Sequence, residues 1–308
     1  MEITETHLSW VLLTPSWVFK LKKALRYDYL DYGSLEARHH QCEEEVPTEP
    51  PAGTAVLSRG AAVTGTLEAG LQLDGDGRAL DYLVHMRRLP RQTNLEQRLR
   101  AGRVDNADID ALAGVLSDFY HGLPGEPLSP QAYIADLRAD VDSDAEHLLA
   151  GDYALERGHL RGLRRDLLGL IDAQASVLSQ RVRRGFVVEG HGDLRPEHVY
   201  LLPQPVAIDC LEFNRRMRLL DVADELGFLA MECARLGAAW AGERLRRCYA
   251  ARSGDEAPET LYRLFMARRA LLWAKLAVWH LDRDPAADRD KWTGRARRYV
   301  ELAGDYLA

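Results

Sequence analysis

Two acidic segments of this 308-residue chain carry residue types suited to phosphoryl transfer. The first runs from His191 to His198 and contains Asp193, and the second centres on Asp209. Phosphoryl transfer needs one carboxylate to accept or orient the proton of the attacking hydroxyl, and another to hold Mg²⁺ against the nucleotide phosphates. Both aspartates follow or end β-rich runs. The pair therefore indicates a phosphoryl-transfer site.

A short β-rich island positions these aspartates, with strands expected at 186–189, 199–202 and 206–208. Helical periodicity surrounds the island. We expect two helices over residues 131–182, and a long helix from Val222 whose apolar residues lie on one face. Short strands inside a helical region build a core poorly but hold loops rigidly.

The N-terminal part indicates a small β-sheet with one helix. Residues 8–23 contain two β-rich runs on either side of a Pro-Ser turn, the pattern of a hairpin. Residues 34–46 predict a helix that stops before Pro47. Residues 54–89 alternate β-rich runs with Gly-Asp turns. The fold class is therefore α+β, with a mostly helical C-terminal part.

Composition and charge exclude several classes of protein. The net charge of −7 and pI of about 5.8 argue against a nucleic-acid or anionic-membrane partner. We expect no signal peptide, no transmembrane helix and, from four scattered cysteines, a reduced cytoplasmic protein. The basic cluster at Arg181, Arg183 and Arg184 is expected to be a solvated helix end. The oligomeric state is left open.

The first acidic segment resembles the catalytic loop of the aminoglycoside phosphotransferase-like and choline-kinase-like family. That loop reads His-Gly-Asp with an Asn five residues after the Asp, and here His191-Gly192-Asp193 precedes His198. Residues 208–212 resemble the family's metal-binding segment, which corresponds to the Asp-Phe-Gly of protein kinases.

The start of the chain resembles an uncharacterised bacterial branch of this group that is sometimes fused to a P-loop kinase-like ATPase. The residues that carry this resemblance are 6–11, 19–23 and 30–32. The resemblance implies a protein-kinase-like bilobal fold. Residues 1–89 would form the β-rich, nucleotide-covering N-lobe, and residues 90–308 the larger, mostly helical C-lobe with the catalytic and metal-binding loops.

The resemblance also implies roles for residues of these loops. Asp193 would be the catalytic base and Asp209 the principal Mg²⁺ ligand. His198 stands where the family has Asn, and imidazole is a poorer Mg²⁺ ligand than an oxygen donor. His198 would act on the metal through a water molecule, favour Mn²⁺ over Mg²⁺, or brace the loop. Four further residues are implied as supporting ones. His191 would hold the loop backbone, and Asp224 would brace the loop. Glu212 belongs to the segment 208–212, and Arg195 would bind phosphate or be solvated.

The family places a strand lysine on the α- and β-phosphates of ATP and pairs it with a helical glutamate. Lys20 and Lys22 both fit, because alternation along a strand puts them on the same face. Lys20 is preferred because it follows Val-Phe. For the glutamate, Glu45 is preferred and Glu44 is second.

The implied function is that of a small-molecule kinase that moves the γ-phosphoryl group of ATP to a hydroxyl, with Mg²⁺ or Mn²⁺ as cofactor. Met86 and Arg88 fall where the hinge meets adenine. The acceptor pocket would come from residues 130–182 and the C-terminal helices, and the acceptor is left open.

Two alternatives remain at this point. A nucleotide-binding pseudokinase fits His198, the helix cut short at Pro47 and the lack of a glycine-rich phosphate loop. A metal-dependent hydrolase would use His191, Asp193, His198 and Asp209 as metal ligands.

Overall fold

The structure is a computed structural model that describes every residue except 7, 28–29, 46–57, 67, 212–213 and 285. The described residues form two compact units. Unit 1 comprises Met1–Val115 and His191–Arg218, and unit 2 comprises Leu116–Gly190 and Leu219–Ala308. The lobe boundary expected after residue 89 is a different division of the chain and stays a prediction.

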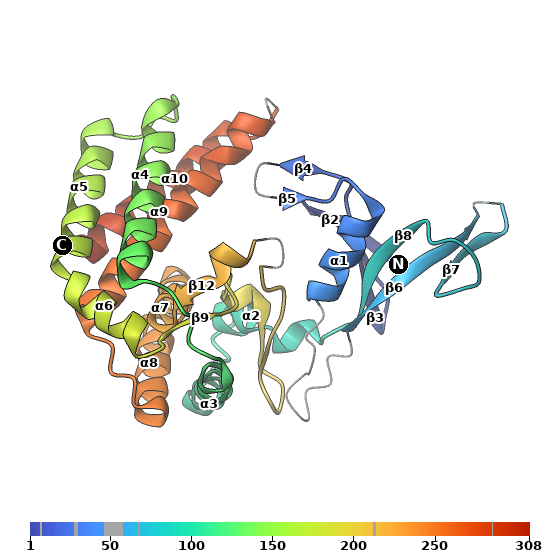
Figure 1. The fold of residues 1–308 in the computed structure, drawn as a ribbon, viewed down its shortest axis with the longest axis horizontal. Helices are drawn as coiled ribbons and strands as arrows, with labels where there is room; N and C mark the ends of the chain where they lie inside the picture. The colour runs from blue at the N-terminus through green and yellow to red at the C-terminus, as the bar shows by residue number, and fades with distance from the viewer. Residues whose placement is uncertain (7, 28–29, 46–57, 67, 212–213, 285) are drawn as a thin grey trace. The chain divides into compact units, whose positions relative to one another are not determined.

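Unit 1 is built on an antiparallel sheet of six strands in the order β1-β2-β3-β8-β6-β7 (Figure 1). The strands are β1 (Glu2–Glu5), β2 (Ser9–Leu13), β3 (Trp17–Lys22), β6 (Ser58–Thr66), β7 (Gly70–Leu73) and β8 (Asp81–Arg87). The predicted hairpin is confirmed as β2 and β3, with Val11 opposite Lys20. A small ribbon pairs β4 (Arg26–Tyr27) with β5 (Leu30–Asp31).

Helix α1 (Leu35–Glu45) packs on β8 and β6 (Figure 1). Its residue His39 stacks on Tyr82 with ring centroids 3.9 Å apart. Tyr82 and Val84 share one face of β8 because strand residues two apart point the same way. Val84 lies opposite Lys20, so Lys20 also points to the face that α1 covers.

The predicted β island is confirmed as three short strands, which belong to two ribbons. In unit 1, β10 (Val199–Tyr200) pairs with β11 (Val206–Ala207). In unit 2, β9 (Val187–Glu189) pairs with β12 (Leu219–Asp221). The short helical segments η1 (Arg91–Thr93), α2 (Leu95–Arg100), η2 (Pro196–His198) and η3 (Arg215–Arg218) complete unit 1.

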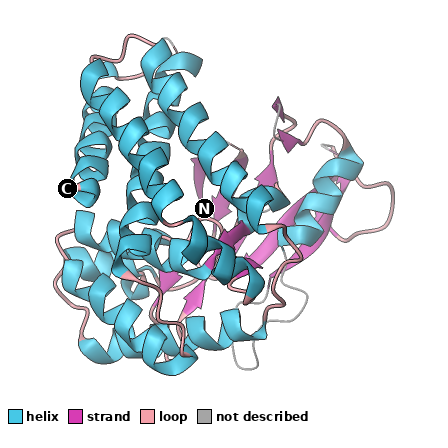
Figure 2. Ribbon diagram, turned by 60° about the vertical axis from the view of Figure 1, so that its left-hand side comes forward, coloured by secondary structure: helices cyan, strands magenta, loops and turns pink. Residues whose placement is uncertain are grey.

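Helices make up most of unit 2 (Figure 2). They are α4 (Pro130–Ala150), α5 (Arg157–Ala173), α6 (Ala175–Arg183), α7 (Val222–Arg235), α8 (Ala239–Ser253), α9 (Glu259–Arg283) and α10 (Arg289–Leu307), and α3 (Asn106–Gly122) runs from unit 1 into unit 2. Within this unit α9 packs against α4, α7 and α10. None of the helices in the described part of the chain is long and apolar enough to cross a bilayer.

Two helix predictions need correction. The segment 131–182 contains three helices, because Gln174 breaks the expected second helix between α5 and α6. Helix α7 is not buried on one face only, since every residue from Val222 to Cys233 is buried. Its neighbours α8 and α9 enclose it, and local periodicity does not report a helix that is covered all round.

Unit 2 holds two buried clusters of charge. Arg181 lies between Asp221 and Asp255, with its nitrogens 2.6–2.8 Å from both carboxylates. The expectation that Arg181 belongs to a solvated helix end is therefore wrong. In the second cluster Asp224 accepts bonds from Arg268 and from Arg269, the latter at 2.7 Å.

Candidate functional site

The ammonium group of Lys20 joins three segments of unit 1. Its Nζ lies 2.8 Å from Oε1 of Glu45 at the end of α1. It also lies 2.7 Å from Oδ1 of Asp209, which follows β11 and is 189 residues away in sequence. The fold therefore brings together the strand lysine, the helical glutamate and the second predicted aspartate.

Lys22 approaches the same glutamate from a more enclosed position. Its Nζ lies 2.6 Å from Oε2 of Glu45. Burial alone would raise the pKa of the Glu45 carboxyl, but Lys20 and Lys22 outweigh it and hold that pKa below its ordinary value. Glu44, the second choice from sequence, is exposed.

Asp209 adopts a backbone conformation that costs free energy. Its φ is +62°, in the left-handed region that residues other than glycine rarely enter, and such strain collects at functional sites. Desolvation would raise the pKa of its carboxyl, but Lys20 and then His198 hold that pKa below the ordinary range. The side chain is 47% exposed, so an ionised carboxylate is open to a ligand.

The loop from His191 is held by its own histidine. The Nε2 atom of His191 lies 2.9 Å from the carbonyl oxygen of Ile208, and its Nδ1 accepts a bond of 3.3 Å from the Asp193 amide. Gly192 has φ +81°, and a Cβ there would lie 2.9 Å from Leu211. The bond to Ile208 and the close approach of Gly192 to Leu211 bring the predicted catalytic loop against the segment that carries Asp209.

Asp193 is paired with Arg195. The Nε atom of Arg195 lies 2.9 Å from Oδ1 of Asp193 in an ion pair, and its Nη2 donates a hydrogen bond of 3.1 Å to Oδ2. Another nitrogen of the same group lies 2.5 Å from Glu197. Arg195 is therefore not a solvated arginine: it orients the carboxylate predicted to be the base.

His198 connects the two aspartates. Its Nδ1 lies 2.8 Å from the carbonyl oxygen of Asp193. Since a carbonyl oxygen only accepts, Nδ1 carries a proton. The other ring nitrogen, Nε2, lies 3.6 Å from Oδ2 of Asp209. The ring thus contacts the loop backbone and also faces the predicted metal ligand.

The donor atoms fit a divalent cation in part. Carboxylate oxygen suits Mg²⁺, and Asp209 offers it at a half-exposed position. The Nε2 atom of His198 suits Mn²⁺ better. Within the described ranges no group of three or more His, Cys, Asp or Glu side chains could hold a metal ion, and the predicted Glu212 lies outside the described residues.

The remaining predicted residues lie elsewhere. Met86 lies in β8 opposite Val18. The guanidinium of Arg88 donates to the Thr14 carbonyl at 2.8 Å, so it is engaged just beyond the ends of β2 and β8. Asp224 belongs to unit 2. The hinge role of Met86 and Arg88 and the bracing role of Asp224 stay predictions.

Sequence reasoning missed Asn94 as a residue that supports the loop. Its side-chain amide donates to the carbonyl oxygen of Glu197 at 2.8 Å, and its Oδ1 caps α2 by accepting from Gln97. An Asn immediately before a helical run is a recognised N-cap signal. That signal gives the cap but not the bond to a residue 103 positions away.

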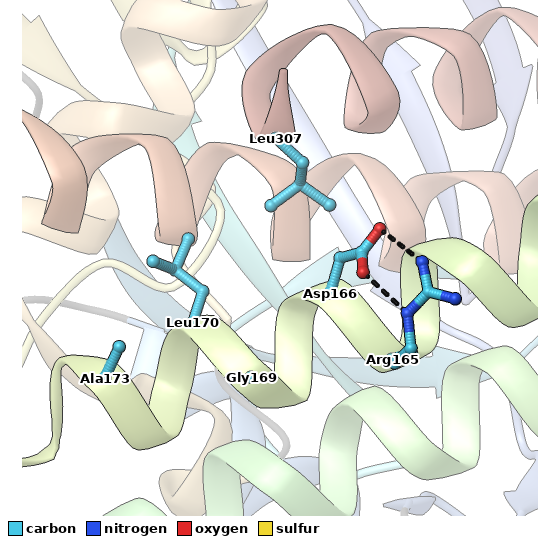
Figure 3. Close-up of a pocket in the computed structure, with 6 residues that line it drawn as sticks. All are labelled: Arg165, Asp166, Gly169, Leu170, Ala173 and Leu307. Carbon is cyan, nitrogen blue, oxygen red and sulfur yellow. Dashed lines mark hydrogen bonds and ion pairs between the residues drawn. The ribbon is translucent and has the colours of Figure 1, made fainter.

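An open depression of about 490 Å³ in unit 2 is lined by none of these residues (Figure 3). It is lined by α5 and the end of α10. Its charged side chains, Arg165 and Asp166, pair with each other at 2.9 Å. The depression offers no group suited to phosphoryl transfer, so the chemistry points to the residues of unit 1 instead.

Comparisons with known sequences find curated relatives of this chain. No family model matches the chain. The chain is 28% identical over 285 residues to Uncharacterized protein Rv2004c of Mycobacterium tuberculosis and to Uncharacterized protein Mb2027c of Mycobacterium bovis. These matches cover 90% of this chain and 54% of each relative, so the chain spans about half the length of the curated relatives it matches.

Two solved structures resemble the whole chain. A choline/ethanolamine kinase family protein from Mesorhizobium loti matches with a TM-score of 0.57 and 15% identity, over 99% of this chain and 90% of its own. The choline kinase LicA from Streptococcus pneumoniae matches with a TM-score of 0.56 and 13% identity, over 99% and 95%. The predicted protein-kinase-like fold, with a β-rich N-terminal part and a mostly helical C-terminal part, is confirmed.

Proposed function

We propose that this chain is an ATP- and Mg²⁺-dependent kinase that transfers the γ-phosphoryl group to a hydroxyl of a small molecule. The observation that supports the proposal most is the position of Lys20 between Glu45 and Asp209, at 2.8 and 2.7 Å. Catalysis of phosphoryl transfer is mostly positioning and charge stabilisation, which is what such a cluster provides.

In the proposed reaction Asp193 accepts the proton of the acceptor hydroxyl. The hydroxyl oxygen attacks the γ-phosphorus, and the bond to the bridging oxygen of ADP breaks. Arg195 keeps the Asp193 carboxylate oriented through its two contacts of 2.9 and 3.1 Å. Lys20 donates to the phosphates. Asp209 would hold Mg²⁺, which neutralises charge on the phosphates.

The acceptor class follows from the names of the structural neighbours and from the family resemblance. We propose choline and ethanolamine first, and aminoglycosides, sugars and amino-acid derivatives next. The proposal includes a cytoplasmic location and no nucleic-acid or membrane partner, as the charge and cysteines of the sequence suggest.

A phosphorylation screen over these hydroxyl compounds with Mg²⁺ and ATP tests the proposal. Asp193→Asn should lower phosphoryl transfer by about 100-fold to 10,000-fold, the usual contribution of a general base. Asp76→Asn is the matched control, since Asp76 is exposed and lies outside the site. Transfer that is unchanged in Asp193→Asn would remove Asp193 from the reaction.

One observation favours a second candidate, a nucleotide-binding protein without transfer activity. Both carboxylate oxygens of Asp193 face the guanidinium of Arg195, so the predicted base is already engaged. ATP binding without transfer to any hydroxyl in the screen would favour this candidate. The hydrolase alternative is less well supported, because both ring nitrogens of His191 contact the loop backbone.

A further inference from the structure

Lys22 lies behind the candidate nucleotide site rather than within it. Its side chain is 0% exposed, whereas that of Lys20 is 14% exposed. Its Nζ lies 5.3 Å from the ring centroid of Tyr32, which is itself fully buried. A group enclosed in this way does not reach a nucleotide directly. Glu45 contacts both lysines and is therefore a link through which Lys22 can act on the phosphates.

Glu45 divides its two carboxylate oxygens between the lysines. Oε1 accepts from Lys20 at 2.8 Å and Oε2 accepts from Lys22 at 2.6 Å. One partner on each oxygen fixes both the position and the rotation of the carboxylate. This matters because Glu45 is the last residue of α1, where the negative end of the helix dipole disfavours a carboxylate.

The two lysines differ in what they can do next. Lys20 also contacts Asp209 at 2.7 Å and retains some exposure, so it can exchange Asp209 for a phosphate oxygen. When it does so, part of its charge is drawn away from Glu45. Lys22 has no such route to solvent and stays with Oε2. A buried carboxylate without a cation is costly, so Lys22 keeps Glu45 in place during the exchange.

We infer that Lys22 is a positioning residue: its buried ammonium group holds Glu45, and Glu45 in turn aims Lys20 at the phosphates of the nucleotide. The inference rests on the proposed function. It adds a second lysine that acts on the nucleotide without touching it.

A double-mutant cycle on ATP binding tests this inference. The variants are Lys22→Met, Glu45→Gln and the two combined, with the Kd for Mg²⁺-ATP measured by isothermal titration calorimetry and the melting temperature measured for each. Each single variant should weaken binding by about tenfold, the size of one lost charge-assisted hydrogen bond. Because Lys22 acts through Glu45, the double variant should bind as weakly as Glu45→Gln alone. Lys291→Met, an exposed lysine of unit 2, is the control.

The melting temperature separates positioning from stability. Lys22→Met should lower it, and the double variant should recover part of the loss because no unpaired buried charge remains. ATP affinity should not recover with it. If Lys22→Met does not fold, Glu45→Gln is compared with the double variant: equal Kd values support the inference.

Three results would overturn it. A lower melting temperature with an unchanged Kd in Lys22→Met makes Lys22 only structural. Losses that add in the double variant mean that Lys22 contacts the nucleotide itself. A wild-type protein that binds no ATP overturns the proposed function and this inference with it, whereas normal ATP binding by Lys22→Met overturns this inference alone.

Discussion

Two clusters of charged side chains, one in each unit, are made of the same chemical groups but differ in their contact with water. In unit 1 Asp209 is 47% exposed and its partner Lys20 is 14% exposed. In unit 2 Asp224 is 0% exposed and its partners Arg268 and Arg269 are 10% and 6% exposed. Both aspartates have a pKa below the ordinary value because neighbouring cations outweigh desolvation.

This difference in exposure shows which ion pairs are candidates for a functional site. Asp224 has two arginine partners at adjacent positions of α9, and its side chain is closed to solvent. Asp209 has one lysine, a strained backbone and an open side. A perturbed carboxylate indicates a functional site only where a substrate or ion can reach it. The predictions below test this contrast.

Asp209→Ala should have the largest effect on function and little effect on folding. We expect Mg²⁺-dependent ATP turnover to fall roughly 1000-fold or more, since a bound divalent cation contributes several kcal/mol to the transition state. Because the Asp209 side chain is half-exposed, we expect only a small loss of unfolding free energy. Turnover and chemical unfolding are measured on the same preparation. Unchanged turnover would remove Asp209 from the site.

Asp224→Ala should show the opposite pattern. Removing it takes away the buried carboxylate that Arg268 and Arg269 share and leaves Arg268 with Asp140 at 3.4 Å. Breaking a buried pair costs about 3–5 kcal/mol of unfolding free energy. Urea denaturation measures the loss, with exposed Asp118→Asn as the control in the same unit. A loss below about 1 kcal/mol would mean that the cluster is as dispensable as a surface pair.

Lys20→Met should weaken ATP binding more than Lys22→Met does. Lys20 both reaches the open side of Asp209 and contacts Glu45, whereas Lys22 acts through Glu45. A charge-assisted bond to phosphate corresponds to about 10-fold to 100-fold in affinity. Titration calorimetry with both variants decides the order. If Lys22→Met has the larger effect, the choice of Lys20 as the phosphate-binding lysine is wrong.

Acid should weaken the ion pairs that Lys20 and Lys22 form with Glu45, because the Glu45 carboxylate becomes protonated. Its pKa is lowered on folding from the ordinary 4.5. The stabilisation is therefore complete above pH 4.5 and is lost as the pH falls through the lowered value. Unfolding free energies of wild type and Glu45→Gln should differ by a constant amount between about pH 7 and pH 5 and converge in stronger acid. Convergence already near neutral pH would contradict the lowered pKa.

His198→Asn should have the smallest effect. An Asn amide can still donate to the Asp193 carbonyl and offers an oxygen in place of Nε2, so we expect retained activity and better use of Mg²⁺ relative to Mn²⁺. The ratio of activities with the two metals measures this. An unchanged ratio with a lower melting temperature would assign His198 to bracing the loop, through its 2.8 Å bond to Asp193.

Local patterns in the sequence predicted much of the architecture. The hairpin of β2 and β3, helix α1 and the three strands of the island follow from turn residues, β-branched runs and a proline. These signals act over a few residues, so they can be read along the chain. The structure also places the predicted site residue Lys20 in contact with Glu45 and Asp209, while the roles of these residues stay predictions.

Tertiary structure decided how these groups share their partners. Alternation puts Lys20 and Lys22 on one face of β3, but only the fold encloses Lys22 beside Glu45 and Tyr32 and leaves Lys20 beside Asp209. The same holds for Arg181, whose carboxylate partners are 40 and 74 residues away.

The sequence by itself thus determined which elements form and which residues could do chemistry, because propensity, turn chemistry and motif spacing are local properties. Exposure and ion pairing depend on which elements meet. Asp209 and Asp224 are both acidic residues near the island, and the local sequence does not report how exposed either side chain is. Only the fold places Arg268 and Arg269 around Asp224 and leaves Asp209 open, because burial is set by contacts between residues far apart in the chain.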